Sequence, residues 1–287
     1  INHVSKSFNR TQILKDVSLK VEKGTFCALL GENGAGKSTL LNILVGLEVV
    51  DSGSGEVLEH SINKDLAPIK NRIGVVTEKI DYHVPISVGK FMEYYGGLFE
   101  NWDELHFKKM MAERKLNIDV PYVQYSRGQK MQTALIAALS MRPEILFIDE
   151  VTSVLDIHAR KYFMEVLDEF KKGGGVVVMT TNIISEIDQV TDKIVLINQG
   201  VVQIDDNVKA LSNQFVKIRK KTGDDHIVFE DKACFWSGNN SDGSVSYIIP
   251  RDLVERYKVS DDLLDRRSVT LDEIFIYQVK TQEMSDA

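Results

Sequence analysis

The segment GENGAGKST, from Gly31 to Thr39, contains residue types that bind phosphate. It matches the pattern G-x-x-x-x-G-K-[ST] of phosphate-binding loops. It also follows an apolar run and precedes an amphipathic helical pattern, which is the strand–loop–helix context that such a loop requires. Glycines let backbone N–H groups approach an anion closely, and the N-terminus of the next helix adds partial positive charge. The sequence therefore predicts a nucleoside triphosphate site, with ATP and Mg²⁺ as the expected ligands.

Three side chains of this loop have individual expected roles. Lys37 is placed to reach the β- and γ-phosphates, the Ser38 hydroxyl to take a Mg²⁺ position, and Thr39 to bond the α-phosphate region. The other expected ATP-binding positions of the loop are Gly31, Glu32, Asn33, Gly34, Ala35 and Gly36. A chance glycine-rich turn is the alternative, but it would not have every fixed position filled between a strand and a helix.

An acidic pair, Asp149 and Glu150, follows the apolar run 145–148. A carboxylate at the end of a buried strand is costly unless it meets a cation. We therefore expect Asp149 to hold Mg²⁺, and Glu150 to polarise the water that attacks the γ-phosphate. An exposed acid pair at a helix N-terminus is the rival interpretation, and it is weak beside a complete phosphate loop.

The elements that must position these residues form an α/β pattern over about residues 1–215, because short β-branched runs alternate with helical patterns. The segment at about 80–140 has little strand character and predicts a helical subdomain inserted in this domain. The expected strands are 25–30, 73–77, 145–148, 176–180 and 194–197, and the expected helices of the α/β core include 38–47, with Leu40, Leu41, Leu44 and Leu47 on one face, and about 158–172.

Residues 216–287 no longer show the alternation of strand and helix patterns, and their short strand patterns predict a small β-rich accessory domain. We expect strands in VKIRK and SVSYIIP, and a loop or hairpin tip at 237–244. A closing helix would place Leu271, Ile274, Phe275 and Gln278 at helical spacing, and we interpret Phe235 and Trp236 as core rather than interface. A flexible tail is the alternative, which the apolar content disfavours.

Composition excludes several classes of protein. The chain has 287 residues, a net charge of −7 and a pI near 5.5, so no global basic field favours nucleic acid. Its two cysteines, Cys27 and Cys234, do not form a disulfide framework, which fits a reducing compartment. The absence of a long apolar run and of a signal peptide pattern predicts a cytoplasmic protein without its own membrane span.

Taken together, these motifs resemble the ATP-binding subunits of ABC transporters over about residues 2–215. YSRGQ, at 125–129, is similar to that family's LSGGQ signature, and SVLD is similar to its D-loop, with Asp156 as the acid. Phe8 stands where the family has an aromatic side chain that stacks on adenine. Glu78 stands at the Q-loop glutamine, which in the family lies at the Mg²⁺ site and couples ATP to the membrane subunits.

The resemblance extends to one branch of the family. Segments 101–123 and 183–200, and SVTLDEIFI near the end, resemble the ATPases of bacterial export-type (type 2) systems, which include peptide and antibiotic-resistance exporters. The resemblance implies transmembrane partner subunits on separate polypeptides, and therefore a location on the inner face of the cell membrane.

The family's mechanism implies a second ATPase subunit. Two such domains clamp two ATP molecules head to tail, in a homodimer or a heterodimer. Ser126, Arg127, Gly128 and Gln129 would then contact the γ-phosphate held by the other subunit, at the start of a helix. Loss of that phosphate opens the dimer and moves the attached membrane helices.

Four residues depart from the family pattern: Asn182 replaces the switch histidine, Val151 a proline, Val154 a glycine and Glu78 the glutamine. Because an asparagine amide can donate a hydrogen bond but cannot carry charge, we expect slower hydrolysis with binding retained. A regulatory nucleotide-binding subunit paired with an active ATPase is therefore the alternative function. A soluble ABC protein of translation, repair or cofactor assembly, and a simple P-loop kinase, fit the whole set of motifs less well.

Overall fold

The structure is a computed structural model that describes residues 1–77, 85–151, 155–184, 187, 190–221, 235–239, 243–256, 259, 263–265 and 269–274. The chain divides into two compact units, the first with residues 1–183 and 189–205 and the second with 184–188 and 206–287. The sequence placed this division near residue 215. Several residues discussed above lie outside the described ones: Glu78, Ser153, Val154, Cys234, Phe275 and Gln278.

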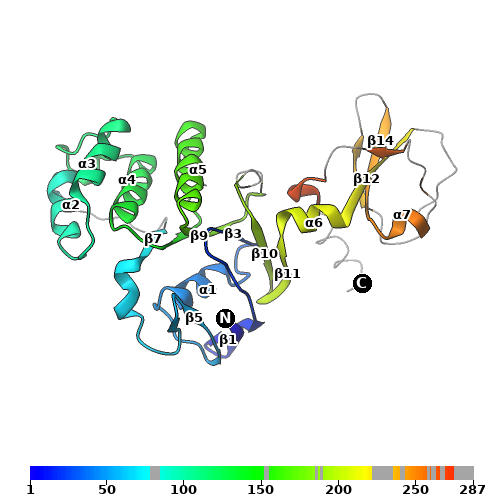
Figure 1. Cartoon of the computed structure of the whole chain (residues 1–287), viewed down its shortest axis with the longest axis horizontal. Coiled ribbons are helices and arrows are strands. Elements are labelled where there is room, and N and C mark those ends of the chain that lie inside the picture. The colour runs from blue at the N-terminus through cyan, green and yellow to red at the C-terminus, as the bar shows by residue number, and fades with distance from the viewer. Residues whose placement is uncertain are drawn as a thin grey trace. The chain divides into compact units, whose positions relative to one another are not determined.

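A six-stranded sheet of order β11-β10-β3-β9-β8-β7 forms the centre of the first unit (Figure 1). Neighbouring strands from β10 to β7 pair in parallel, and β3 is buried at every residue, as is usual for a parallel sheet covered on both faces. All the strands predicted for this sheet are present, with each end within one residue of the prediction. The predicted strands are β3 (Phe26–Leu30), β7 (Ile73–Thr77), β8 (Ile145–Asp149), β9 (Val176–Thr181) and β10 (Lys193–Asn198). The sixth strand, β11 (Val201–Asn207), was not predicted.

Helices follow strands β3 and β8 of this sheet. Helix α1 (Lys37–Leu44) starts directly after the glycine-rich loop and buries Leu40, Leu41 and Leu44. The predicted helix 38–47 was too long, because the chain turns at Gly46 with φ +78° and Leu47 is 73% exposed. Helix α5 (Ile157–Lys172) agrees with the prediction and ends at the glycines that follow it.

A small antiparallel sheet of order β2-β1-β4 brings the start of the chain beside α1. Its strands are β1 (Asn2–Phe8), β2 (Thr11–Val17) and β4 (Ser52–Ser54), followed by the hairpin β5 (Glu56–Val57) and β6 (His60–Ser61) and the 3₁₀ helix η1 (Ala67–Arg72). This sheet carries Phe8 and Ile13, which reappear at the site.

The predicted helical insertion is confirmed (Figure 1). Its helices begin at side-chain caps from Ser87, Asp103 and Ser126, each of which accepts a hydrogen bond from a backbone N–H of the first turn. They share a core that includes Phe107, Tyr122 and other apolar side chains. The elements are α2 (Val88–Gly96), α3 (Glu104–Glu113), η2 (Tyr122–Gln124) and α4 (Arg127–Ser140).

The second unit contains a four-stranded antiparallel sheet of order β13-β14-β12-β15. Strands in VKIRK and SVSYIIP are confirmed, but the predicted loop at 237–244 was wrong at its start, because β13 continues to Asn239. Leu271 and Ile274 are buried in a helical turn. The elements are α6 (Val208–Gln214), β12 (Phe215–Lys221), β13 (Phe235–Asn239), β14 (Ser244–Pro250), α7 (Leu253–Arg256) and β15 (Leu264–Asp265).

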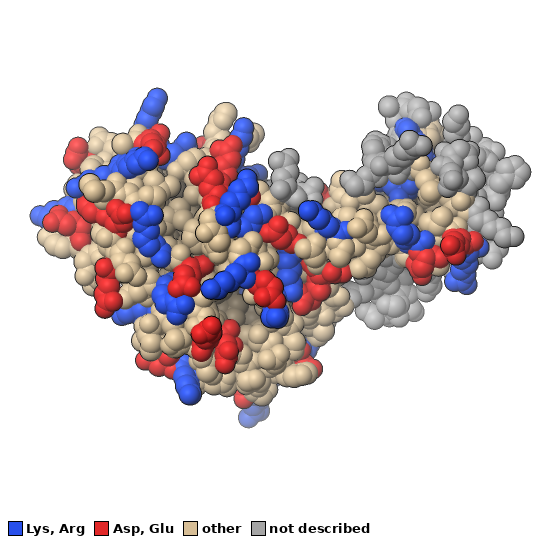
Figure 2. Space-filling model, viewed as in Figure 1, with Lys and Arg blue, Asp and Glu red and all other residues tan. Residues whose placement is uncertain are grey.

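Two surface properties bear on partners. Basic and acidic side chains alternate over the face of the first unit shown in Figure 2, without a broad area of one sign. Within the described ranges, no helix has both the length and the apolar character needed to cross a membrane.

Candidate functional site

The glycine-rich loop leaves β3 with two glycines in conformations and spaces that exclude a side chain. Gly31 has φ +152°, and a Cβ there would lie 2.2 Å from the carbonyl oxygen of Ile197. Gly36 has φ +108°, and a Cβ would lie 2.7 Å from Cδ2 of Leu14. The loop can therefore pass between β10 and β2 only because both positions lack a side chain.

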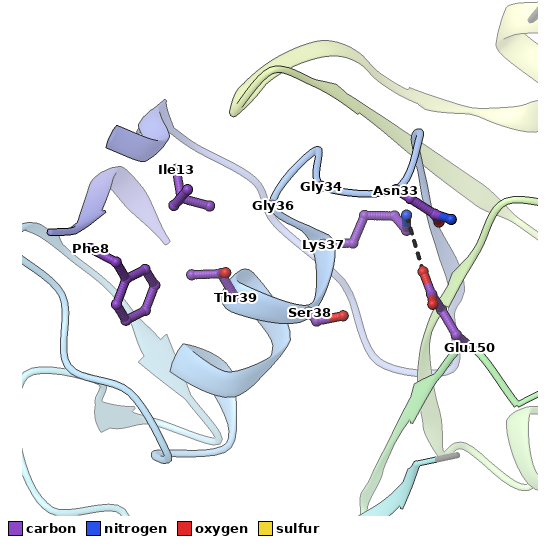
Figure 3. A pocket seen from close by; sticks show the side chains of 9 residues that line it. All are labelled: Phe8, Ile13, Asn33, Gly34, Gly36, Lys37, Ser38, Thr39 and Glu150. Atoms are coloured by element: carbon purple, nitrogen blue, oxygen red, sulfur yellow. Dashed lines mark ion pairs between the residues drawn. The ribbon is translucent and has the colours of Figure 1, made fainter. Parts of the chain in front are cut away.

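Lys37 is buried at the centre of this loop, with only 3% of its surface exposed. Its Nζ donates to the carbonyl oxygens of Gly31 at 2.8 Å and Glu32 at 3.0 Å, and lies 3.3 Å from Oε1 of Glu150 (Figure 3). A buried ammonium is costly unless it is paired. These oxygens therefore hold the cation in place at the wall of the pocket.

The N-terminus of α1 forms the next part of the site. Gly36 is the N-cap and gives no side-chain hydrogen bond, and the first turn has no acidic residue. Ser38 and Thr39 in this turn both line the pocket. Uncapped N–H groups and the helix dipole favour an anion at this position.

Thr180, at the end of β9, connects the two acidic residues. It lies opposite Asp149 in the parallel pairing of β8 and β9, and it is fully buried. Oδ1 of Asp149 accepts hydrogen bonds from Ser38 Oγ at 3.0 Å and from Thr180 Oγ1 at 2.6 Å. The N–H of Glu150 donates to Thr180 Oγ1 at 3.1 Å, and Glu150 has φ +51°. Sequence reasoning missed Thr180, although its place at the end of a predicted strand was a usable signal.

A pocket of about 320 Å³ joins these groups (Figure 3). Its apolar part is formed by Phe8 and Ile13, while Lys37, Ser38 and Glu150 supply charge and hydroxyl oxygen. Ile13 was missed, because the pattern of its strand does not indicate which face meets a ligand. The lining residues are Phe8, Ile13, Asn33, Gly34, Gly36, Lys37, Ser38, Thr39 and Glu150.

The apolar end of the pocket has its own electrostatic feature. Phe8 is 40% exposed, and Nζ of Lys6 lies 4.9 Å from the centroid of its ring. Lys6 also donates to the carbonyl oxygen of Val49 at 2.8 Å and pairs with Glu48 and Asp51. A cation near an aromatic ring restricts that ring's position and is attracted by its π-system.

Three loop residues do not line the pocket: Gly31, Glu32 and Ala35. Gly31 and Glu32 contribute carbonyl oxygens to Lys37, and Ala35 is buried. Asp149 does not line the pocket itself, but it accepts hydrogen bonds from Ser38, which does, and from Thr180.

The signature segment forms a capping box at the start of α4. Ser126 Oγ accepts from the N–H of Gln129 at 3.2 Å, and Gln129 Oε1 accepts from the N–H of Ser126 at 2.9 Å. Ser126 and Arg127 are exposed, while Gly128 and Gln129 are half-buried. The structure does not bring these residues to the pocket of the same chain.

The other predicted positions are separate from the pocket lining. Asn182 is exposed and follows the end of β9, where Thr181 Oγ1 accepts from the N–H of Ile183 at 3.0 Å. Asp156 caps α5 by accepting from the N–H of Ala159 at 2.8 Å. Val151, directly after Glu150, is fully buried.

Comparisons with known proteins agree on one family. The family model described as ABC transporter matches residues 14–153. The chain is 28% identical over 207 residues to the linearmycin resistance ATP-binding protein LnrL of Bacillus subtilis, covering 69% of this chain and 65% of that protein, or slightly less than two thirds of it. It is 27% identical over 303 residues to the methionine import ATP-binding protein MetN of Clostridium acetobutylicum, covering 95% and 93%. It is 30% identical over 200 residues to the energy-coupling factor transporter ATP-binding protein EcfA2 of Streptococcus sanguinis, covering 65% and 71%.

Solved structures show the same fold. An ATP-binding subunit of an ABC transporter superposes with a TM-score of 0.68 at 20% identity, covering 74% of this chain and 91% of that one. A dimeric, post-hydrolysis structure of the ATP-binding cassette MJ0796, bound to ADP and Pi, gives 0.63 at 22% identity, covering 72% and 97%.

Proposed function

Because this chain belongs to the family of ABC transporter ATP-binding proteins, we propose that it is the ATP-hydrolysing subunit of a membrane exporter. ATP hydrolysis in this family is coupled to transport, and the membrane-spanning helices would lie on separate polypeptides. Export is supported by the similarity to the linearmycin resistance protein, and by segments 101–123 and 183–200, which resemble the ATPases of bacterial export-type systems. MetN is an import protein by name, so import is the competing direction.

The observation that carries the proposal is one pocket with an apolar end at Phe8 and a buried cation at Lys37. An adenine ring would stack on Phe8, and the phosphates would lie against the N-terminus of α1. Because Lys37 Nζ is already 3.3 Å from Glu150, a γ-phosphate in the loop would compete with Glu150 for this cation. The freed carboxylate could then accept a proton from the attacking water.

The residues present also fit Mg²⁺. The Ser38 hydroxyl and the Asp149 carboxylate lie 3.0 Å apart, and both are oxygen ligands of the kind that Mg²⁺ prefers. The bound ion would neutralise charge that develops on the phosphates. Glu78, the third predicted ligand, is not among the described residues.

A second ATPase subunit completes the proposed site. The start of α4, where Ser126 and Arg127 are exposed, does not line the pocket of its own chain, and it would contact the γ-phosphate held by another subunit. We propose a homodimer or a heterodimer bound to transmembrane subunits at the inner face of the membrane. The second unit of the chain would act in dimer contact or regulation.

Phosphate release by the purified chain tests the enzymatic part of this proposal. Wild type should release phosphate from ATP, and Glu150→Gln should reduce release on the order of 100-fold or more while ATP still binds. Glu165→Gln is a matched control, because Glu165 is an exposed residue of α5 that pairs with Lys161. Binding of ATP without release above that of Glu150→Gln would instead support the regulatory alternative, which Asn182 favours.

Two further measurements test the partners. Extraction from membranes with a multispanning protein would support the transporter role, and recovery without one would contradict it. Deletion of the residues after 215 should change dimerisation or ATP turnover; no change in either would contradict the role proposed for the second unit.

A further inference from the structure

We propose that Thr180 is a positioning residue for ATP hydrolysis, because its hydroxyl holds both Asp149 and Glu150 in the geometry of the site. This inference rests on the proposed function of the pocket. Neither a motif of the sequence nor the lining of the pocket indicates Thr180, which is fully buried behind the two acidic residues.

The hydroxyl of Thr180 forms one continuous hydrogen-bond chain. Its single hydrogen is donated to Asp149 Oδ1 at 2.6 Å, and its oxygen accepts the N–H of Glu150 at 3.1 Å. A hydroxyl has one hydrogen and two lone pairs, so these two contacts use it in complementary ways. The chain therefore ties the backbone of one acidic residue to the side chain of the other.

The backbone of Glu150 shows why such a tie is needed. Its φ of +51° lies in the left-handed region, which costs a non-glycine residue backbone energy. The N–H of Glu150 meets both Thr180 Oγ1 at 3.1 Å and the Thr180 carbonyl oxygen at 3.3 Å. Thr180 thus fixes the direction in which the Glu150 side chain leaves β8, toward Lys37.

Asp149 depends on the same hydroxyl for a second reason. Ser38 is the other donor to Asp149 Oδ1, and Ser38 is also the residue expected at the Mg²⁺. If the Ser38 oxygen binds the ion, Thr180 still orients the Asp149 carboxylate. Partners of this kind, one shell behind a metal ligand, commonly determine both metal affinity and rate.

The neighbouring threonine has a different role. Thr181 Oγ1 accepts from the N–H of Ile183 in the turn after β9, so its hydroxyl faces the loop. In contrast, the Thr180 hydroxyl donates to Asp149 of β8, the residue opposite it in the parallel register. The assignment therefore applies to Thr180 alone.

The test compares Thr180→Val, which removes the hydroxyl at similar size, with Thr180→Ser, which keeps it. Thr191→Val is the matched control, since Thr191 is a buried threonine just before the amino end of β10, whereas the phosphate loop follows the carboxyl end of the parallel strand β3. Thr180→Val should lower kcat for phosphate release on the order of 10- to 100-fold, with KM for ATP near the wild-type value. Thr180→Ser should recover most of kcat, and Thr191→Val should match wild type.

A second readout does not need turnover. The binding of trinitrophenyl-ATP is titrated with Mg²⁺, and Thr180→Val should need several-fold more Mg²⁺ at the midpoint, on the order of 10-fold, while Thr180→Ser and Thr191→Val should not. If wild type releases no phosphate above Glu150→Gln, the proposed ATPase function fails, and this Mg²⁺ shift alone decides the role of Thr180.

Three results would each overturn the inference. Equal kcat and equal Mg²⁺ midpoints for Thr180→Val and Thr191→Val would do so. An equal loss in Thr180→Ser and Thr180→Val would also do so, because it would assign the effect to the methyl group. If Thr180→Val does not fold, Thr180→Cys must show the Mg²⁺ shift, since a thiol is a weak donor; an unchanged midpoint would end the proposal.

Discussion

The phosphate loop passes close to the backbone of β10 at Gly31, so Gly31→Ala tests the packing around the site. A Cβ at this position would lie 2.2 Å from the carbonyl oxygen of Ile197 and 3.2 Å from Cβ of Ala35. Ile197 belongs to β10, which pairs in parallel with β3 along Cys27–Leu30. The carbonyl oxygen therefore cannot retreat unless the centre of the sheet is disturbed.

Two costs contribute to the expected loss. A non-glycine residue at φ +152° costs about 1–3 kcal/mol in backbone strain. Overpacking against a rigid backbone atom adds about 1–3 kcal/mol. We expect Gly31→Ala to reduce the free energy of unfolding by about 2–6 kcal/mol, a large part of the roughly 5–15 kcal/mol of an ordinary domain.

Gly34→Ala separates the two costs. Gly34 belongs to the same loop and has φ +85°, but a Cβ there meets nothing within 4 Å, so only the strain of about 1–3 kcal/mol applies. Urea unfolding followed by circular dichroism, without nucleotide, measures both variants against wild type. If Gly31→Ala is no less stable than Gly34→Ala, the close approach to Ile197 does not constrain the loop and the argument is wrong.

Two other predictions concern Lys6 and Cys27. Lys6→Met removes the cation that lies 4.9 Å from the centroid of the Phe8 ring. Because such contacts contribute about 0.5–1 kcal/mol, the affinity for trinitrophenyl-ATP should fall about two- to fivefold in a titration. Lys6→Arg keeps the cation and should keep the affinity. Burial raises the pKa of the Cys27 thiol from its ordinary value of 9.0 to about 12. The unfolded thiol therefore ionises first, so this group's contribution to stability is complete below pH 9.0 and is lost as pH rises toward about 12. At about pH 8.5, mass spectrometry should find Cys27 unmodified by iodoacetamide in folded protein but modified in urea; equal labelling would contradict its burial.

Much of the first unit could be predicted from sequence because its central strands are buried on both faces. Runs such as FCALL and VVVMTT need no partner to be recognised, since a parallel sheet makes whole segments apolar. The phosphate loop could be predicted for a different reason. Its fixed residues act through the local backbone, so the position of Lys37 relative to Gly31 follows from one short segment.

The features that were missed depend on contacts outside their own short segments. Thr180 meets Asp149 only because β8 and β9 pair with those two residues opposite each other, and a shift of that register would point Thr180 elsewhere. Ile13 reaches the pocket through a hairpin at the start of the chain. The early end of α1 before Leu47 likewise depends on the turn at Gly46, whose extra Cβ would meet Leu66 at 3.1 Å.

The same distinction bears on the departures from the family pattern. Asn182 is exposed beyond the end of β9 and does not line the pocket, whereas Glu150 is held from behind by buried atoms of Thr180. Val151, the residue after Glu150, is also fully buried. The proposed general base is therefore supported from the interior of the sheet, through Thr180. We therefore expect that Asn182, at the position of the family's switch histidine, lowers turnover because its amide cannot carry a charge, while nucleotide binding at the pocket is retained.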